Sequence, residues 1–429
     1  MYETPLTGLV LSGGGARAAY QVGVLRAIAR LRREKMGPRS RLRSPFGVIV
    51  GTSAGAINAA ALACQADRFE ASVEVLARVW QDFRAEQVYR ADSLGVIRSG
   101  AQWLTMLSLG WVIARWRKAR PRSLLDNEPL SRLLQRMVPL DRLQMMLQQK
   151  QLHALAVTAS SYTTGEHVTF YAAGAPLEPW SRTQRLAVPA TLTHEHLLAS
   201  SAIPFVFPAK KLEHGADAAW YGDGSMRQTA PLSPAIHLGA QRLLIIGAGR
   251  MHEPAGRRLQ VGGYPSLAQI AGHAMANIFL DALAVDIERM QRINRTLALL
   301  PDTVRQDTPL RPLESLVISP SQRLDDVASR HLDSLPVAVR GLLRGVGVGG
   351  KGSDATGGSA LASYLLFEAP YTRELMALGE ADVNARSDEV LQFFGWDRDE
   401  RAARRAAESP PAPPAPPAAT AGEVDLELP

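Results

Sequence analysis

The stretch TGLVLSGGGARAAYQVGVLRAIARLRRE, residues 7–34, decides the fold class. Its first residues form an apolar run typical of a buried strand, three glycines follow, and residues 16–34 carry apolar side chains at helical spacing. The stretch PFGVIVGTSAGAINAAALACQA, residues 45–66, repeats this order with a helix of small residues. Strand, helix, strand and helix in one short segment predict a parallel βαβ unit and an α/β fold.

The composition is that of a globular protein. The chain has 429 residues, of which 46% are hydrophobic, enough for one large domain or two ordinary ones with a real core. The single cysteine, Cys64, excludes a disulfide framework. The first twelve residues lack a basic region followed by a long apolar one, so we expect no signal peptide. We expect a cytoplasmic location, with peripheral contact at the inner membrane surface.

The distribution of charged and apolar residues indicates which kinds of partner the protein can bind. The net charge is +7, and its excess lies in two basic clusters, residues 26–43 and 115–122. Such clusters either meet anionic lipid or are solvated helix ends and loops. The longest apolar window, residues 101–116, falls short of the roughly 20 residues that cross a bilayer. No nucleic-acid motif accompanies the basic residues, so we expect no nucleic-acid partner.

Further elements are predicted after these first two strands and two helices. Strands are expected within residues 151–172, 218–226 and 242–249, and a short helix that Pro204 stops is expected within residues 197–212. The chain from there to about residue 400 is expected to be largely helical, with the glycine-rich residues 345–359 as a loop. Residues 402–429 are rich in Pro and Ala and cannot form a core, so we expect disorder.

The most specific local motif is GTSAG, residues 51–55, between a predicted strand and its helix. In a nucleophile elbow, small residues such as Gly51 and Gly55 relieve crowding at a sharp strand-to-helix turn that exposes the serine oxygen. Ser53 is therefore the candidate nucleophile, and the helix dipole would favour its deprotonated form. An ordinary N-capping serine in a glycine-bounded turn has the same pattern. An ordinary α/β-hydrolase reaches its serine only after several strands, so another architecture is expected.

The triplet Gly13, Gly14 and Gly15 can present backbone N–H groups to a phosphate or to a transient oxyanion. A dinucleotide loop needs an acid at the end of the second strand, which ends here in Gly-Thr-Ser, and a P-loop needs Gly-Lys-Ser/Thr where this chain has Ala-Arg-Ala. We therefore expect this loop beside Ser53, at the carboxyl ends of adjacent parallel strands, facing an attacked carbonyl. Arg17 would then either fix the loop or meet an anionic head group.

The third motif is YGDGSMRQTAP, residues 221–231, which sets Asp223 between two glycines after an apolar segment. A plain Asp-Gly turn explains this pattern when it is taken alone. With Ser53 and the glycine loop also present, Asp223 becomes the best candidate for the base. Partial burial and a direct hydrogen bond to the serine would make its carboxylate basic enough.

Together and in this order, the three motifs resemble those of the patatin-like phospholipase family, lipid acyl hydrolases with a Ser-Asp dyad. The corresponding stretches are GGGARA (13–18), GTSAG (51–55) and DGS (223–225), with ASSAIPFVFPA (199–209) before the aspartate. Two positions depart from the family pattern: Ala18 stands where the family has glycine, and Ser225 where it more usually has Gly or Ala. Neither departure removes a reacting group.

The resemblance implies a three-layer α/β fold with a mostly parallel central sheet flanked by helices. Residues 6–250 would form the catalytic domain, residues 251–401 a mainly helical region packed on it, and residues 402–429 a disordered tail. The implied substrate is a phospholipid or another acyl-lipid, with no cofactor and no metal. Residues 101–116 would form an interfacial cap at a membrane surface, or else an amphipathic core helix.

The resemblance also implies roles for individual residues. Ser53 would be the nucleophile, Asp223 the general base, and Gly13, Gly14 and Gly15 the oxyanion hole, with supporting roles for Arg17, Gly51, Gly55 and Gly224. Two other functions stay open: an esterase or thioesterase for soluble acyl substrates, and an inactive lipid-binding regulator.

Overall fold

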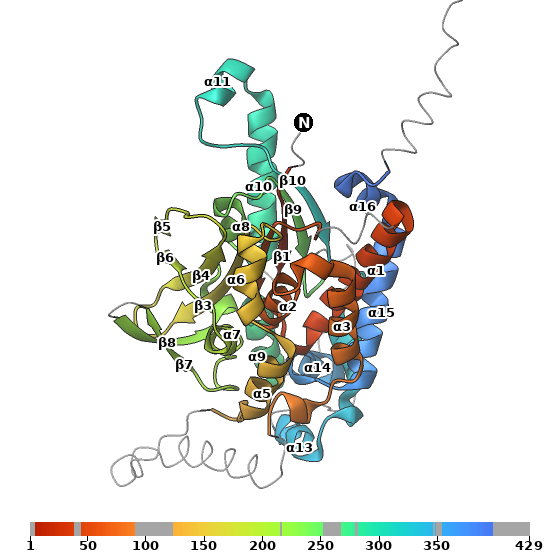
Figure 1. Cartoon of the computed structure of the whole chain (residues 1–429). Coiled ribbons are helices and arrows are strands. Elements are labelled where there is room, and N and C mark those ends of the chain that lie inside the picture. Colours follow the sequence, from red (N-terminus) through yellow and green to blue (C-terminus); the bar gives the residue numbers. More distant parts are fainter. Residues whose placement is uncertain are drawn as a thin grey trace, which may run out of the picture.

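The computed structural model describes residues 5–37, 44–90, 123–214, 217–251, 267–278, 282–345, 348 and 354–397. These residues form one sheet with helices on both faces (Figure 1). The strands are β1 (Thr7–Leu11), β2 (Val48–Thr52), β3 (Ala154–Ser161), β4 (His167–Ala173), β5 (Ser181–Arg182), β6 (Arg185–Pro189), β7 (Lys210–His214), β8 (Asp217–Asp223), β9 (Arg242–Ile246) and β10 (Glu314–Ile318).

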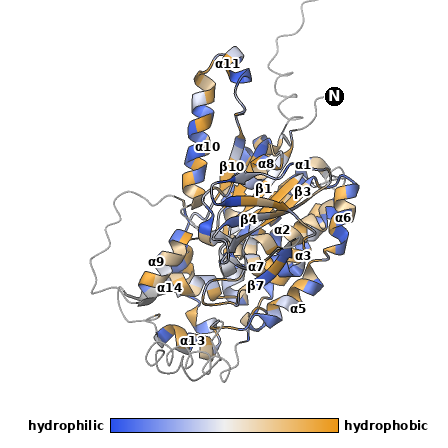
Figure 2. Ribbon diagram, turned by 90° about the vertical axis from the view of Figure 1, so that its left-hand side faces the viewer, coloured by the Kyte–Doolittle hydropathy of each residue, from blue (hydrophilic) through white to orange (hydrophobic). Residues whose placement is uncertain are grey.

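The helices of the N-terminal half are α1 (Ala19–Met36), α2 (Ala54–Ala63), α3 (Phe69–Gln81), α5 (Glu128–Met137), α6 (Asp141–Gln148) and α7 (His194–Ser200). Those of the C-terminal half are α8 (Ser233–His237), α9 (Leu267–Ala276), α10 (Ala282–Leu299), α11 (Asp302–Gln306), α12 (Leu324–Ser329), α13 (Val337–Gly345), α14 (Asp354–Leu365), α15 (Ala369–Ala385) and α16 (Ser387–Phe394). Helices α10 and α11 project away from the body (Figure 2).

The sheet has the order β10-β9-β1-β2-β3-β4-β6-β5, with β8 paired to the end of β3 and β7 to β8. The first five strands in this order are mutually parallel, and in the register Leu9 lies beside Ile49 on one side and Leu244 on the other. The predicted adjacency of the glycine-loop strand and the serine strand is thereby confirmed. Because parallel strands point the same way, the loops that follow β1 and β2 open at the same edge.

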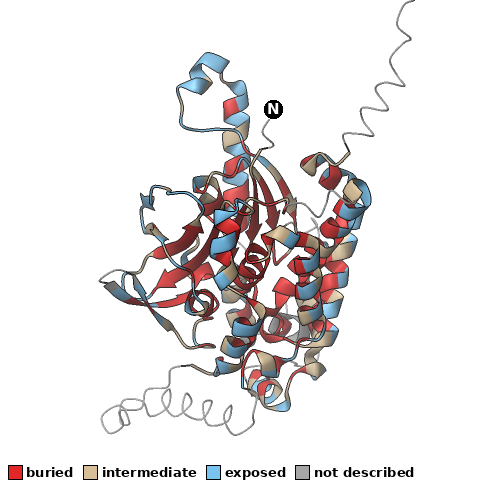
Figure 3. Cartoon of the chain, in the orientation of Figure 1, coloured by how far each residue is buried: buried red, intermediate tan, exposed pale blue. Residues whose placement is uncertain are grey.

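Alternating side chains of the buried strands supply two cores, one on each face of the sheet. The central strands are buried, whereas the surrounding helices also carry exposed residues (Figure 3). Leu9 and Leu11 lie in the larger core with α1, α2, α3, α14 and α15. Val10, between them, lies in the smaller core with α8 and α10. The expected three layers, a mostly parallel sheet between helices, are therefore present.

The C-terminal half differs from the sequence-based expectation in two elements. It contributes a strand, β10, which extends the sheet by pairing in parallel with β9. A five-residue apolar run cannot be told from a helix segment by periodicity, so β10 was not expected. The loop predicted for residues 345–359 was wrong in its second part, because α14 begins at Asp354. Packing of α14 on α9 and α12 outweighs the low helix propensity of its two glycines.

Some of the segments predicted from the sequence are not described by the structure. The domain boundaries predicted at residues 250 and 401 stay predictions. The apolar window 101–116, the cluster 115–122 and the tail 402–429 lie outside the described residues. Within the part of the chain that the structure describes, no helix is both long enough and apolar enough to cross a membrane.

Helices α1 and α15 pack unusually close together, because each has a glycine at the contact. A Cβ atom at Gly23 would overlap the backbone of Met376, and one at Gly379 would overlap the carbonyl oxygen of Tyr20. The Tyr20 hydroxyl donates to Asp382 Oδ2 at 2.8 Å across the same contact. The C-terminal helices are therefore integral to the packing of the first βαβ unit.

We predict that Gly23→Ala lowers the free energy of unfolding by about 1–3 kcal/mol, because backbone cannot yield as a flexible side chain does. Urea denaturation of the full chain measures this change. The control is Gly341→Ala in α13, where an added Cβ meets nothing within 4 Å. This control is expected to gain about 0.5–1 kcal/mol from helix propensity, and an equal loss in both variants would contradict the prediction.

Candidate active site

Ser53 occupies a sharp turn between β2 and α2. Its φ is 56° and its ψ is −130°, a left-handed conformation that a non-glycine residue adopts at a cost. A Cβ at Gly55 would lie only 2.5 Å from the carbonyl oxygens of Leu11 and Ser12, and one at Gly51 would lie 2.5 Å from that of Gly55. The two glycines thus allow α2 to pack directly on the end of β1, as in a nucleophile elbow.

Asp223 ends β8 and lies directly beside the serine. Ser53 Oγ donates a hydrogen bond to Asp223 Oδ2 at 2.6 Å, and the Ser225 backbone N–H donates to Asp223 Oδ1 at 2.9 Å. Both Ser53 and Asp223 are almost completely buried. Gly224, next in the chain, passes so close to the Thr158 carbonyl that a side chain would not fit. In the described residues, no histidine hydrogen-bonds to Ser53 or Asp223.

Burial controls the acidity of this carboxyl group. Loss of solvation raises the pKa of Asp223 to about 6, although the hydrogen bonds from Ser53 and Ser225 act to lower it. A carboxylate with such a pKa is a better proton acceptor than an exposed one, yet it is still mostly ionised at neutral pH. The pair therefore has the hydrogen bond and the basicity that proton transfer from a serine needs.

The glycine loop follows β1 on the neighbouring strand. Gly13 and Gly14 lead into a 3-10 turn, η1 (Gly15–Ala18), and Gly15 has a φ of 55° and lines the same pocket as Ser53. Among the described residues, no acceptor receives the backbone N–H of Gly14 or Gly15. The loop therefore has two backbone donors without an acceptor, and one of them belongs to Gly15, which lines the pocket of Ser53.

Buried amide side chains hold this loop against the serine helix. Gln21 Nε2 donates to the Ser12 carbonyl at 2.7 Å, and Asn58 Nδ2 donates to Gln21 Oε1 at 3.1 Å. The Trp80 indole N–H completes the chain by donating to Asn58 Oδ1 at 3.0 Å. The roles of Gln21 and Asn58 could not be predicted from the sequence, because a polar residue in a helix acquires such a role only through its partner.

A second missed residue is Ser200, at the end of α7. Its Oγ accepts the backbone N–H of Ser53 at 2.9 Å, and two residues later the Ala202 carbonyl accepts the N–H of Asp223 at 3.0 Å. From the sequence, residues 199–209 show only a resemblance to the family. In the structure, Ser200 and Ala202 accept the backbone N–H groups of Ser53 and Asp223 and so hold the two residues in position.

Arg17 is not among the described residues that line the pocket of Ser53. Its side chain is buried and makes an ion pair with Asp325 of α12. The sequence left two roles open for Arg17, fixing the glycine loop or binding an anionic head group. The geometry favours the first.

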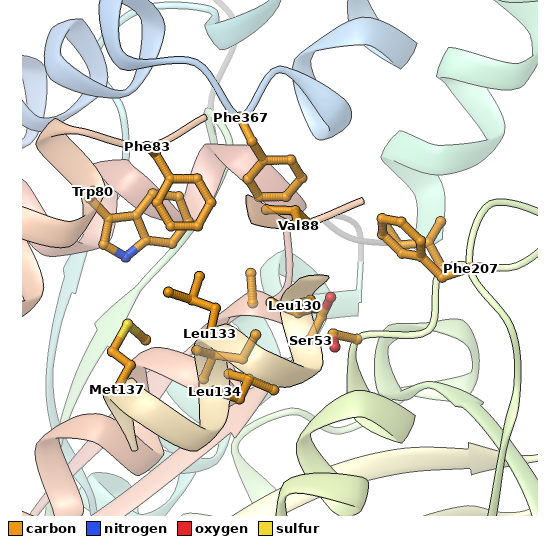
Figure 4. Close-up of a pocket in the computed structure, with 15 residues that line it drawn as sticks. Ser53, Trp80, Phe83, Val88, Leu130, Leu133, Leu134, Met137, Phe207 and Phe367 are labelled. Atoms are coloured by element: carbon orange, nitrogen blue, oxygen red, sulfur yellow. The ribbon is translucent and has the colours of Figure 1, made fainter. Parts of the chain in front are cut away.

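An apolar pocket extends from Ser53 between α2, α3, α5 and the chain around Phe207 (Figure 4). Its lining is Gly15, Ser53, Ala54, Ile57, Trp80, Phe83, Val88, Leu130, Leu133, Leu134, Met137, Ser201, Ile203, Phe207 and Phe367. Of these described residues, only Ser53 and Ser201 carry a hydroxyl group, so this lining suits a hydrocarbon chain.

The family description patatin-like phospholipase matches residues 9–236, which include the glycine loop, Ser53 and Asp223. The chain belongs to the patatin-like phospholipase family. Membership supports lipid acyl hydrolase activity in general terms. The resemblance seen in the three motifs is thus confirmed, whereas Asp325 and the other C-terminal residues lie outside the matched segment.

Solved structures also match the chain at low identity. VipD from Legionella pneumophila is 13% identical, with 87% of this chain and 67% of VipD covered and a TM-score of 0.31. ExoU from the type III secretion system of Pseudomonas aeruginosa, solved in complex with SpcU, is 17% identical, with 87% and 70% covered and a TM-score of 0.24. No curated protein matches the chain.

We predict that Ser200→Ala lowers the free energy of unfolding by about 1–3 kcal/mol, because the buried N–H of Ser53 loses its acceptor. Urea denaturation measures the loss. The matched control is Ser329→Ala, whose hydroxyl donates to the Asp326 carbonyl at 2.7 Å in a half-buried place. Its removal leaves no buried donor unsatisfied, so a loss as large as that of Ser200→Ala would refute the assigned role of Ser200.

Proposed function

We propose that this protein is a serine lipid acyl hydrolase of the phospholipase A type, which cleaves fatty acyl esters through Ser53 and Asp223. The observation that carries the proposal is the buried 2.6 Å hydrogen bond between these residues at the end of an apolar pocket. Family membership supports the general reaction, and the dyad is the more specific claim.

In the first half of the proposed reaction, Asp223 accepts the proton of Ser53 as the serine oxygen attacks the ester carbonyl. The developing oxyanion is stabilised by the free N–H groups of Gly14 and Gly15, with Gly13 shaping the loop. Collapse of the tetrahedral intermediate breaks the ester bond. The leaving alcohol takes the proton from Asp223, and the fatty acyl group stays on Ser53.

In the second half, water attacks the acyl-enzyme while Asp223 accepts one of its protons. A second oxyanion forms at the same donors and collapses, returning the proton to Ser53 and releasing the fatty acid. The residues of this chain supply the nucleophile, the base and the oxyanion donors, so the proposed steps use no cofactor and no metal.

The pocket supports an acyl chain as the group that is bound. Its aromatic and aliphatic side chains would cover a fatty acyl tail and exclude water from the ester. Phe205 lies between the pocket residues Ile203 and Phe207 and is 70% exposed. A large apolar side chain displayed beside the pocket is suited to contact with a lipid surface, and we propose peripheral membrane contact here.

Active-site labelling tests the dyad. Wild-type protein is expected to react with a long-chain alkyl fluorophosphonate and to release fatty acid from phospholipid vesicles, whereas Ser53→Ala should do neither. Asp223→Asn should lose about 10²- to 10⁴-fold in kcat, since it cannot accept the proton.

The controls separate the alternatives. Labelling that survives Ser53→Ala would exclude the dyad. A wild type that labels and cleaves only soluble esters or thioesters would favour the esterase alternative. A folded wild type that neither labels nor hydrolyses any ester would favour the lipid-binding regulator.

The raised pKa of Asp223 predicts a pH dependence. Because the ionised carboxylate is the active form, kcat/KM should be constant above the pKa of about 6 and fall about tenfold per pH unit below it. Burial lowers the pKa of His167 to about 4, so this imidazole is neutral near pH 6, where Asp223 titrates, and does not cause the predicted fall. A pH profile of kcat/KM measured on a soluble ester checks the prediction. The prediction is wrong if the residual activity of Asp223→Asn falls with pH in the same way.

A further inference from the structure

The outer side of the glycine loop is covered by helices that lie beyond the family-matched segment. Arg17, within η1, makes an ion pair with Asp325 of α12 and donates from Nε to Ser363 Oγ of α14 at 2.8 Å. It also donates weakly to the Ala360 carbonyl, at 3.4 Å. One side chain of the loop thus connects to two helices more than 300 residues further along the chain.

The surroundings of Arg17 favour a fixed position. Its guanidinium carbon lies 4.0 Å from the centre of the Tyr364 ring, and the side chain is only 3% exposed. Burial acts to lower the pKa of Arg17, but Tyr364, Asp325 and Tyr371 together raise it, so the group stays charged. A buried charge is tolerated only with its partner in place, which makes Asp325 the anchor of this contact.

The backbone of the loop is held by the same helix. A Cβ at Gly15 would overlap the carbonyl of Tyr364, so α14 passes in direct contact with a residue that lines the pocket of Ser53. Ala16 and Ala18, on either side of Arg17, are fully buried. The loop can therefore shift only if α14 or the Arg17 contacts shift with it.

We propose that Asp325 and Ser363 act through Arg17 as positioning residues for the oxyanion donors Gly14 and Gly15. The C-terminal segment outside the family match then completes the active site without touching the substrate. This inference rests on the proposed function, because it concerns the same reaction. Arg17 is thereby assigned to the loop's support and not to a lipid head group.

A positioning role predicts that variants lose kcat and keep their KM. Substrate binding depends mainly on the apolar pocket, whereas stabilisation of the oxyanion depends on the placement of two N–H groups. Loss of the anchor should therefore lower kcat about 10- to 100-fold and leave KM within about twofold, since small misplacements of catalytic groups cost this much.

An alkyl trifluoromethyl ketone provides a readout that a purely structural role would not change. Ser53 Oγ adds to its carbonyl carbon, the serine proton passes to Asp223, and the carbonyl oxygen becomes an oxyanion at the proposed donors. A fatty acid of the same chain length occupies the pocket without forming this adduct, so the ratio of the two affinities isolates the oxyanion donors.

The experiment compares full-length wild type, Asp325→Asn, Ser363→Ala and Glu380→Gln. Glu380→Gln is the matched control, because Glu380 of α15 pairs with Arg26 of α1 at 3.2 Å and so connects the same two parts of the chain away from the loop. Inhibition by the ketone is expected to weaken about 10- to 100-fold in Asp325→Asn and Ser363→Ala, with unchanged fatty-acid binding. Glu380→Gln should match wild type in both.

The outcomes distinguish the two proposals. A wild type that forms no ketone adduct overturns the proposed function. A wild type that forms it, with Asp325→Asn and Ser363→Ala equally sensitive, overturns only the positioning role. Parallel loss of ketone and fatty-acid affinity also overturns it, because that is the mark of general damage. Should thermal melting show Asp325→Asn to be unfolded, Ser363→Ala decides alone.

Discussion

The hydrogen bond from Ser53 Oγ to Asp223 Oδ2 constrains the architecture more than any other contact in the site. It joins the end of β2 to the end of β8, and both side chains are buried, so neither can be displaced without breaking the packing around it. A buried carboxylate needs donors, and this one has the serine hydroxyl and the amide of Ser225. The 2.6 Å distance therefore depends on the register of several strands and one short helix.

The sheet meets this constraint by its order of strands. Strands β2 and β8 are not neighbours, but both pair with β3, β2 in parallel and β8 in antiparallel fashion. Strand β3 therefore fixes the position of the serine turn relative to that of the aspartate. Strand β1 lies on the other side of β2 and brings the glycine loop to the same edge. The chain leaves β1 toward β2, while β9 and β10 lie beyond β1, and such a reversal of strand order is where open α/β sheets form their sites.

Much of this could be predicted from sequence because the signals are local. Apolar runs followed by GGGARA and GTSAG specify strand, turn and helix within a few residues, and the adjacency of β1 and β2 follows from the rules for βαβ units. Strand β10 and the start of α14 could not be predicted in this way. A short edge strand and a glycine-containing helix are stabilised by what they pack against, and those partners lie far away in the chain.

The residues of the candidate site likewise fall into those predictable from local sequence and those identified only by contacts between distant residues. The sequence by itself determined which groups are available, namely Ser53, Asp223 and the glycines, because each is marked by neighbours that a tight turn requires. Only the tertiary structure decided what holds them: Ser200 on the amide of Ser53, Asn58 and Gln21 behind the loop, and Asp325 and Ser363 on Arg17. The physical reason is that a hydrogen bond or a buried ion pair between distant residues leaves no periodicity or spacing in the sequence.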